Sequence, residues 1–288
     1  MTSISRTFLS AMPYPFKRVL VGSDPLITAT AERFTPVRID KLKVTAKLKN
    51  SILSNRPYDA GYSVDRNKKL AVVIPYRNRA EHLAKLIPEL TEQLVKQGIS
   101  FRIIVAEQAD EKPFNRGKSM NVGALEEWEW SDYFCFHDVD NIPLRAEYGC
   151  PSEPTRLVSH WDNTWRTYNM LEVTTFGGIV SINKSALINA NGFNNEYWGW
   201  GMEDDDFLIR CLLAGSTPHQ DTQGLYSDMN NPPSEADAAN DWVRHSNKRW
   251  LRWQMARTHF NKIGLNNIDY TITDDQQCDG YRKVSYRS

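Results

Sequence analysis

The chain has 288 residues, of which 41% are hydrophobic, enough for one large core or a core with a small appendage. Its 35 Lys and Arg residues balance 35 Asp and Glu residues, so the formal net charge is zero. A neutral chain lacks the broad basic field that nucleic-acid binding favours, and functional charge is therefore expected to be local.

The cysteines and the apolar runs indicate the redox compartment of the protein and whether it spans a membrane. The four cysteines are scattered without a CxxC pair, which argues against a zinc cluster and fits a reducing compartment. In an oxidising setting, Cys135 and Cys150 would be a candidate disulfide. No apolar run reaches the roughly 18 residues of a membrane span, and the N-terminus lacks the apolar core of a signal peptide. We therefore expect a soluble protein, with peripheral membrane association left open.

Residues 1–68 are interrupted by prolines at positions 13, 15, 25 and 36, which prevent any long element. Within them, residues 37–49 alternate partly and predict either a strand or a short helix. We expect this segment to be an N-terminal extension packed on the main domain.

A regular pattern begins at residue 69. It predicts buried strands at 70–74, 101–105 and 133–136 and helices at 80–96 and 115–128. Such alternation indicates an α/β fold, Rossmann-like, with a doubly wound and mainly parallel sheet. Ligands bind beyond the carboxyl ends of such strands, where this chain places Arg77, Arg79, Glu107, Gln108, Asp138 and Asp140.

The second half is less regular. Residues 145–175 predict an irregular segment rich in Trp, followed by a strand at 176–182 and a helix at 184–190. Another helix is expected from the acidic run at residue 203 to Gly215. Residues 216–241 are polar and predict a mobile loop.

Asp138-Val139-Asp140 follows the third predicted strand. Alternate side chains point to the same side there, and two close carboxylates repel each other unless a cation lies between them. Hard divalent ions take such oxygen ligands and bridge them to phosphates. The pattern favours a metal–diphosphate site over a capped turn before Pro143.

Glu203-Asp204-Asp205-Asp206 is the second cluster. The helix dipole explains one or two acids in a first turn, but four in a row repel one another. Because the run follows a Trp- and Gly-rich segment, it suggests a carboxylate beside an aromatic platform for a sugar.

A basic set completes the candidates, with Arg77, Arg79, Arg116 and Lys118 as phosphate or base partners, or else as solvated surface. His245 is a candidate metal partner, although a lone His is more often not a ligand.

These residues occur in ordered blocks, and together the blocks resemble the β-1,4-galactosyltransferase family over about residues 70–272. The blocks are Pro75-Tyr76-Arg77-Asn78-Arg79, Phe114-Asn115-Arg116, Asp138-Val139-Asp140, Phe176-Gly177-Gly178, Trp198-Gly199-Trp200-Gly201-Met202 with the acid run, Arg244-His245-Ser246 and Gly264-Leu265-Asn266. The resemblance implies a GT-A fold over residues 69–288, with a nucleotide half at 69–143 and an acceptor half at 144–288. It also implies inverting transfer of galactose or N-acetylgalactosamine from a UDP-sugar to a glycan hydroxyl, with Mn²⁺.

Carried over by position, the resemblance assigns Asp204 as the catalytic base and Asp140 and His245 as metal ligands. The implied donor-binding residues are Pro75, Tyr76, Arg77, Arg79, Phe114, Arg116, Asp138, Val139, Thr175 and Trp200. The implied acceptor-binding residues are Trp200, Gly201, Asp205, Arg249 and Trp250.

Three departures from the family pattern alter these expectations. Trp242 and Val243 stand where animal members place a Met or a His before the metal-binding His, which leaves the third protein ligand open. Thr175 stands where galactose-selective members carry a Tyr, so the smaller side chain keeps UDP-N-acetylgalactosamine open as donor. The animal membrane anchor is absent from the sequence, which predicts a cytoplasmic and bacterial enzyme.

Two rival functions stay open at this stage. One is transfer from UDP-N-acetylglucosamine or UDP-glucose on the same scaffold. The other is a glycan-binding module that has lost catalysis. A sugar nucleotidyltransferase is disfavoured, because no Gly-rich phosphate loop follows the first strand. The acceptor, the linkage position and the oligomeric state are not specified by these residues.

Overall fold

The first half of the catalytic region alternates strands and helices as the sequence predicts. In the computed structural model, which describes residues 16–21, 26–31, 64–162, 176–199, 201–229 and 262–288, these elements are β4 (Lys69–Tyr76), α2 (Ala80–Lys96), β5 (Ser100–Gln108), α3 (Arg116–Glu126) and β6 (Tyr133–His137). β4 pairs in parallel with both β5 and β6. The expected α/β class is confirmed, and the helix at 80–96 has the expected bounds.

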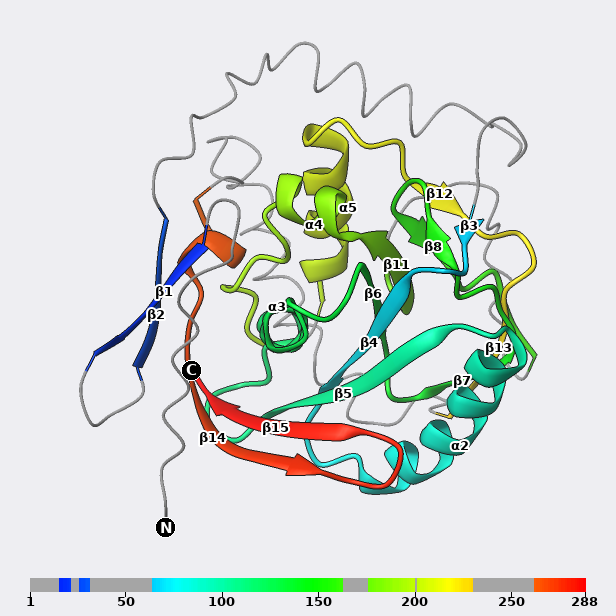
Figure 1. Cartoon of the computed structure of the whole chain (residues 1–288), viewed down its shortest axis with the longest axis horizontal. Coiled ribbons are helices and arrows are strands. Elements are labelled where there is room, and N and C mark those ends of the chain that lie inside the picture. Colours follow the sequence, from blue (N-terminus) through cyan, green and yellow to red (C-terminus); the bar gives the residue numbers. More distant parts are fainter. Residues whose placement is uncertain (1–15, 22–25, 32–63, 163–175, 200, 230–261) are drawn as a thin grey trace.

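The apolar run of β4 is continuous because the strand is covered on both faces. Ala71 and Val73 belong to a core cluster with Met120 of α3, whereas Val72 and Ile74 belong to another with the inward side chains of α2. α2 accordingly lies on one side of β4 and β5, with α3 on the other (Figure 1). All five of these β4 and α3 side chains are at most 1% exposed.

A mixed sheet of ten strands carries the fold, in the order β1-β2-β14-β15-β5-β4-β6-β11-β9-β12. Its middle pairings, from β15 to β6, are all parallel. β11 (Ile179–Asn183) then runs antiparallel to β6, and α4 (Lys184–Asn189) and α5 (Glu203–Leu213) follow it in the chain. Short strands complete this side: β3 (Val64–Asp65), β7 (Asn141–Arg145), β8 (Cys150–Pro151), β9 (Thr155–Arg156) and β10 (His160–Trp161).

The opposite edge of the sheet is built by segments that sequence patterns did not predict. β14 (Asp269–Gln277) and β15 (Arg282–Arg287) form an antiparallel hairpin, and β15 pairs in parallel with β5. β14 also pairs with β2 (Leu26–Ala31), which pairs with β1 (Phe16–Val21). Two strands of the expected N-terminal extension therefore continue the sheet. The domain division at residue 68 stays a prediction, and the segment 37–49 lies outside the described residues.

The expected mobile loop at 216–241 is wrong in its first part. β12 (His219–Gln220) pairs with β9, and β13 (Leu225–Asp228) pairs with β10 and β7. Tyr226 is fully buried, so apolar packing and strand pairing order this stretch despite its polar composition. Residues 230–241 lie outside the described ranges. A 3₁₀ helix, η1 (Leu265–Asn267), precedes β14.

Two further expectations concern the candidate disulfide and membrane-spanning helices. Cys135 and Cys150 are free thiols, so the disulfide left open by the sequence is not formed. Burial raises the pKa of Cys150 to about 11, which keeps this thiol protonated at neutral pH. Within the described ranges, no helix has both the length and the apolar character to cross a membrane.

The contact of α3 with β4 requires a glycine. A β-carbon at Gly123 would lie 2.4 Å from Cγ1 of Val73, a fully buried side chain with little freedom to move. We predict that Gly123→Ala destabilises the fold by about 1–3 kcal/mol, as overpacking does in other cores. Chemical denaturation measures this change. Val73→Ala supplies the control, because the double variant should cost less than the sum of the two single variants; full additivity would contradict the steric explanation.

Candidate active site

Arg116 is the point where three chain segments meet. As the first residue of α3, it donates from Nε to Oδ1 of Asp138 at 2.7 Å, just beyond β6. Its Nη1 donates to Oε1 of Glu203, the first residue of α5, at 3.1 Å. Nη2 also donates to the carbonyl of Gly178, before β11, at 3.4 Å. One guanidinium thus fixes the carboxyl end of β6 against the start of two helices.

Burial disfavours the charged form of the carboxylates around Arg116. Burial raises the pKa of Glu203 to about 7, with a further rise from Asp204, while Arg116 opposes the shift. Burial likewise raises the pKa of Asp138 to about 6. Oε2 of Glu203 is buried without a hydrogen-bond partner among the described residues. Negative charge at this point is therefore only partly compensated by the protein.

Asp140 is oriented by a relay of hydrogen bonds. Nε1 of Trp161 donates to Oδ1 of Asn141 at 2.6 Å, which turns the Asn141 amide nitrogen toward Oδ1 of Asp140, 2.9 Å away. Burial raises the pKa of Asp140, and the neighbouring Asp228 raises it further, while Arg79 lowers it. Asp228 was not predicted from sequence; only the β13–β7 pairing brings it beside Asp140.

The four-acid run divides into two pairs. Glu203 and Asp206 are three residues apart, share one face of α5 and are buried, whereas Asp204 and Asp205 are partly exposed. Asp206 accepts from Nε of Arg210 at 2.6 Å, and Oδ1 of Asp204 accepts from the Asp205 amide at 2.9 Å. The helical period therefore directs half of the run inward and half toward the site opening.

The loop between β5 and α3 forms one wall of the site, and Arg77 supports it. Arg77 donates to the carbonyls of Asp110 and Lys112, both at 2.6 Å, and its guanidinium carbon lies 5.8 Å from the centre of the Phe114 ring. The amide of Gly199 donates to the Phe114 carbonyl at 2.8 Å, which ties the Trp- and Gly-rich segment to the same wall.

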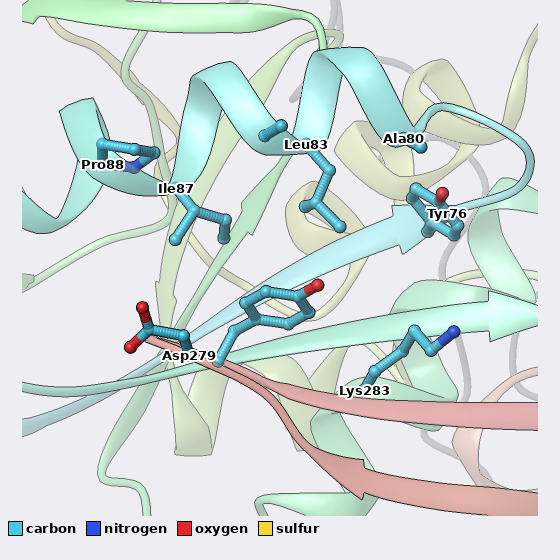
Figure 2. Close-up of a pocket in the computed structure, with 9 residues that line it drawn as sticks. Tyr76, Ala80, Leu83, Ile87, Pro88, Asp279 and Lys283 are labelled. Carbon is cyan, nitrogen blue, oxygen red and sulfur yellow. The ribbon is translucent and has the colours of Figure 1, made fainter.

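Tyr76 is separated from this group. With Lys283 it lines a groove of about 430 Å³ between α2 and β15, whose floor includes Leu83 and Ile87 (Figure 2). Pro75 and Val139 are buried beside the strand ends. The structure thus brings together Arg116, Asp138 and the acid run, with Asp140 and Arg79 adjacent, and directs Tyr76 toward the α2 face. Five further predicted site residues lie outside the described ranges: Thr175, Trp200, His245, Arg249 and Trp250.

The raised pKa of Glu203 has a consequence for stability. Its folded pKa of about 7 exceeds the ordinary value of 4.5, so its stabilising contribution is complete below pH 4.5 and is lost as pH rises toward 7. We predict that Glu203→Gln removes this loss, so its stability relative to wild type improves between pH 4.5 and 7, by at most a few kcal/mol. Thermal denaturation in EDTA across this range measures the effect. A difference that does not vary with pH would contradict the assignment.

Comparisons with known proteins identify relatives of this chain. The family described as the N-terminal region of glycosyl transferase group 7 matches residues 33–151, and the N-terminal domain of galactosyltransferase matches residues 163–226. β-1,4-Galactosyltransferase 7 of Drosophila melanogaster is 32% identical over 228 residues, which are 75% of this chain and 66% of that protein. β-1,4-Galactosyltransferase 4 of Cricetulus griseus is 40% identical over 226 residues, or 76% and 63% of the two chains. This chain therefore spans slightly less than two thirds of either relative.

Solved structures that resemble this chain identify its fold. The catalytic domain of Drosophila β1,4-galactosyltransferase 7 superposes with a TM-score of 0.61 at 28% identity, covering 76% of this chain and 94% of that one. The expected GT-A fold is thereby confirmed.

The expectation of a cytoplasmic, bacterial protein is wrong, because the relatives are animal, Golgi-resident type II membrane galactosyltransferases. The chain belongs to the β-1,4-galactosyltransferase family.

Proposed function

We propose that the chain is an inverting glycosyltransferase that moves galactose from UDP-galactose to a sugar hydroxyl, with a β-1,4 linkage and Mn²⁺ as cofactor. The observation that carries the proposal is the meeting of Arg116, Asp138 and the start of α5 at the carboxyl end of β6. A solved Drosophila relative carries manganese, UDP-Gal and xylobiose. N-acetylgalactosamine is a second donor sugar to test, since Thr175 keeps it open on sequence.

The residues around Asp140 fit a divalent cation. Asp140 and Asp228 offer carboxylate oxygens, the ligands that Mn²⁺ and Mg²⁺ take, and their mutual repulsion is what such an ion relieves. We assign Asp140 and His245 as ligands. Asp228 is proposed as the third protein ligand, because Trp242 and Val243, which stand where animal members carry a Met or a His, are not suitable ligands. When bound, the ion supplies neutralisation of the diphosphate leaving group.

On the donor side, Arg116 is placed to add positive charge beside the diphosphate, and Asp138 to accept from donor hydroxyls. Arg79 adds a further cation near Asp140. Arg77 and Phe114 act as the wall of the nucleotide pocket, since Arg77 already holds the loop carbonyls. Pro75, Val139, Thr175 and Trp200 complete the proposed donor contacts, whereas Tyr76, which the sequence also assigned to the donor, lines the groove between α2 and β15 and is left out of the proposal.

On the acceptor side, Asp204 takes the proton from the attacking hydroxyl. It is partly exposed on the first turn of α5, while its neighbour Glu203 is buried against Arg116. Attack from the face opposite the leaving group inverts the anomeric carbon in one displacement, so no covalent intermediate is needed. Asp205, Gly201, Trp200, Arg249 and Trp250 are the proposed acceptor contacts.

A donor screen tests the proposed activity. UDP-galactose, UDP-N-acetylgalactosamine, UDP-N-acetylglucosamine and UDP-glucose are offered with xylobiose or N-acetylglucosamine as acceptor, and UDP release is measured with Mn²⁺ and with EDTA. We expect release from UDP-galactose that EDTA abolishes and Mn²⁺ restores. Release from UDP-glucose alone would replace the donor assignment, and no release with any pair would favour a glycan-binding module.

A charge-neutral substitution tests the proposed base. Asp204→Asn should lower kcat by about 100-fold or more, since general-base catalysis typically contributes about 100- to 10,000-fold, and leave the Kd for UDP–Mn²⁺ within about 3-fold. Asp279→Asn, an exposed carboxylate in the groove of Figure 2, is the matched control and should keep wild-type kcat. An Asp204→Asn variant that retains most of its turnover would show that another group removes the proton.

A further inference from the structure

Behind the site, six asparagines join three segments that are distant in sequence. We call this set the asparagine clamp; it consists of Asn115, Asn121, Asn191, Asn195, Asn266 and Asn267. They come from the start of α3, from the turn after α4 and from η1. None of these side chains belongs to the proposed donor, acceptor or metal contacts, so their number calls for another explanation.

Asn195 is the centre of the clamp. Its carbonyl accepts from Nδ2 of Asn115 at 2.7 Å, and its Oδ1 accepts from Nδ2 of Asn121 at 2.8 Å. Its own Nδ2 donates to the Gly264 carbonyl at 2.8 Å. A carboxamide offers a donor and an acceptor on one rigid plane, so one side chain can bridge α3 and the turn before β14.

The α3 side of the clamp is held tightly. Asn115 is fully buried, and its side chain caps α3 by accepting from the Lys118 backbone amide at 2.8 Å. The backbone amide of Asn115 donates to Oε1 of Gln108 at 2.7 Å. Asn121 makes two bonds to the backbone of Phe193, of 2.7 and 2.9 Å. A β-carbon at Gly117 would lie 3.1 Å from the Asn194 carbonyl, so α3 and this turn are already in close approach.

The other side of the clamp is linked to α5. The Asn191 side chain donates from Nδ2 to Oδ1 of Asn266 and accepts at Oδ1 from the Asn266 backbone amide, each at 3.0 Å, and the Asn191 carbonyl accepts from the Leu265 amide at 2.9 Å. Arg210 of α5 donates to the Ile263 carbonyl at 2.7 Å and pairs with the buried Asp206. The turn that Asn195 holds is therefore also fixed to the helix that begins with the acid run.

These bonds set the relative position of the site groups. Arg116 follows Asn115 directly, and Glu203 is reached from Asn195 through seven residues of chain that include the Gly199 tie to Phe114. We propose that Asn195 is a positioning residue, which holds the start of α3, and with it Arg116, at the correct separation from the first turn of α5. The catalytic meaning of this proposal rests on the proposed function.

The test compares two substitutions at Asn195 with a matched asparagine elsewhere. Asn195→Ala removes all three side-chain bonds, whereas Asn195→Asp keeps the acceptor for Asn121 and loses the donors to Gly264 and Asn267. Asn183→Ala is the control: Asn183 caps α4 by accepting from the Ala186 amide at 2.9 Å and lies outside the clamp. Amide hydrogen exchange, Kd for UDP–Mn²⁺, and kcat and KM for UDP-galactose are measured below the unfolding temperature of every variant.

For Asn195→Ala we expect kcat to fall by about 10- to 100-fold, because small misplacements of catalytic groups are costly, while KM and the UDP Kd change by less than about 3-fold. Exchange should rise together at 116–119, 204–207 and 265–267. For Asn195→Asp the rise should be confined to 265–267, with a smaller fall in kcat. Asn183→Ala should loosen only α4 and the 151–152 backbone to which Asn183 also donates, and it should keep kcat within about 2-fold.

Unchanged kcat in Asn195→Ala, or a fall in kcat matched by Asn183→Ala, would overturn the proposal. Exchange that rises only next to residue 195 would also overturn it. If Asn195→Ala does not fold, Asn195→Asp decides by the same criteria. A wild-type chain that releases no UDP from any donor would refute the proposed function separately, and the exchange pattern would then support or overturn the coupling by itself.

Discussion

The arrangement of the site depends on one cation, the Arg116 guanidinium, whose side chain is only 16% exposed. Arg116 bonds Asp138, Glu203 and the Gly178 carbonyl, and this one side chain thereby joins three segments to the start of α3. Two raised carboxylate pKa values show that the guanidinium offsets only part of the cost of burying these groups. Removal of one partner from such a set typically costs about 3–5 kcal/mol, because the remaining charges stay buried. The same deficit of positive charge favours the binding of a further cation at this point.

Sheet topology explains why Arg116 reaches these partners. β4, β5 and β6 are parallel, so their carboxyl ends meet at one edge, and α3 begins there directly after β5. α3 then packs against β4 closely enough that Gly123 has no room for a side chain. The strand pairings thus position the start of α3, and the asparagine clamp positions the start of α5 against it.

Sequence patterns predicted the elements that carry their own periodicity. The helix at 80–96 has five buried apolar side chains at helical spacing and begins and ends where expected. The strands β12 and β13 were missed because segments of two and four residues are too short to show such a period, and only pairing with β9, β10 and β7 makes them strands. β14 was missed for a related reason, since most of its residues are exposed. Asp228 could not be found because its place beside Asp140 is set by that unpredicted pairing.

The acid run shows how far residue type alone could lead. Its four carboxylates indicated function because like charges repel, and that inference treated them as equivalent. The helical period separates them: Asp206 is satisfied by Arg210, Glu203 is held by Arg116, and Asp204 and Asp205 keep access to solvent. Repulsion within the run is therefore reduced by two arginine partners, Arg116 and Arg210, rather than by the helix dipole alone. What remains exposed is a pair of carboxylates on a fixed first turn, at the edge where the sheet already gathers Arg116 and Asp138. A run that is costly in an isolated helix becomes tolerable here because the fold supplies one cation to each inward member, while the outward members stay partly exposed to solvent.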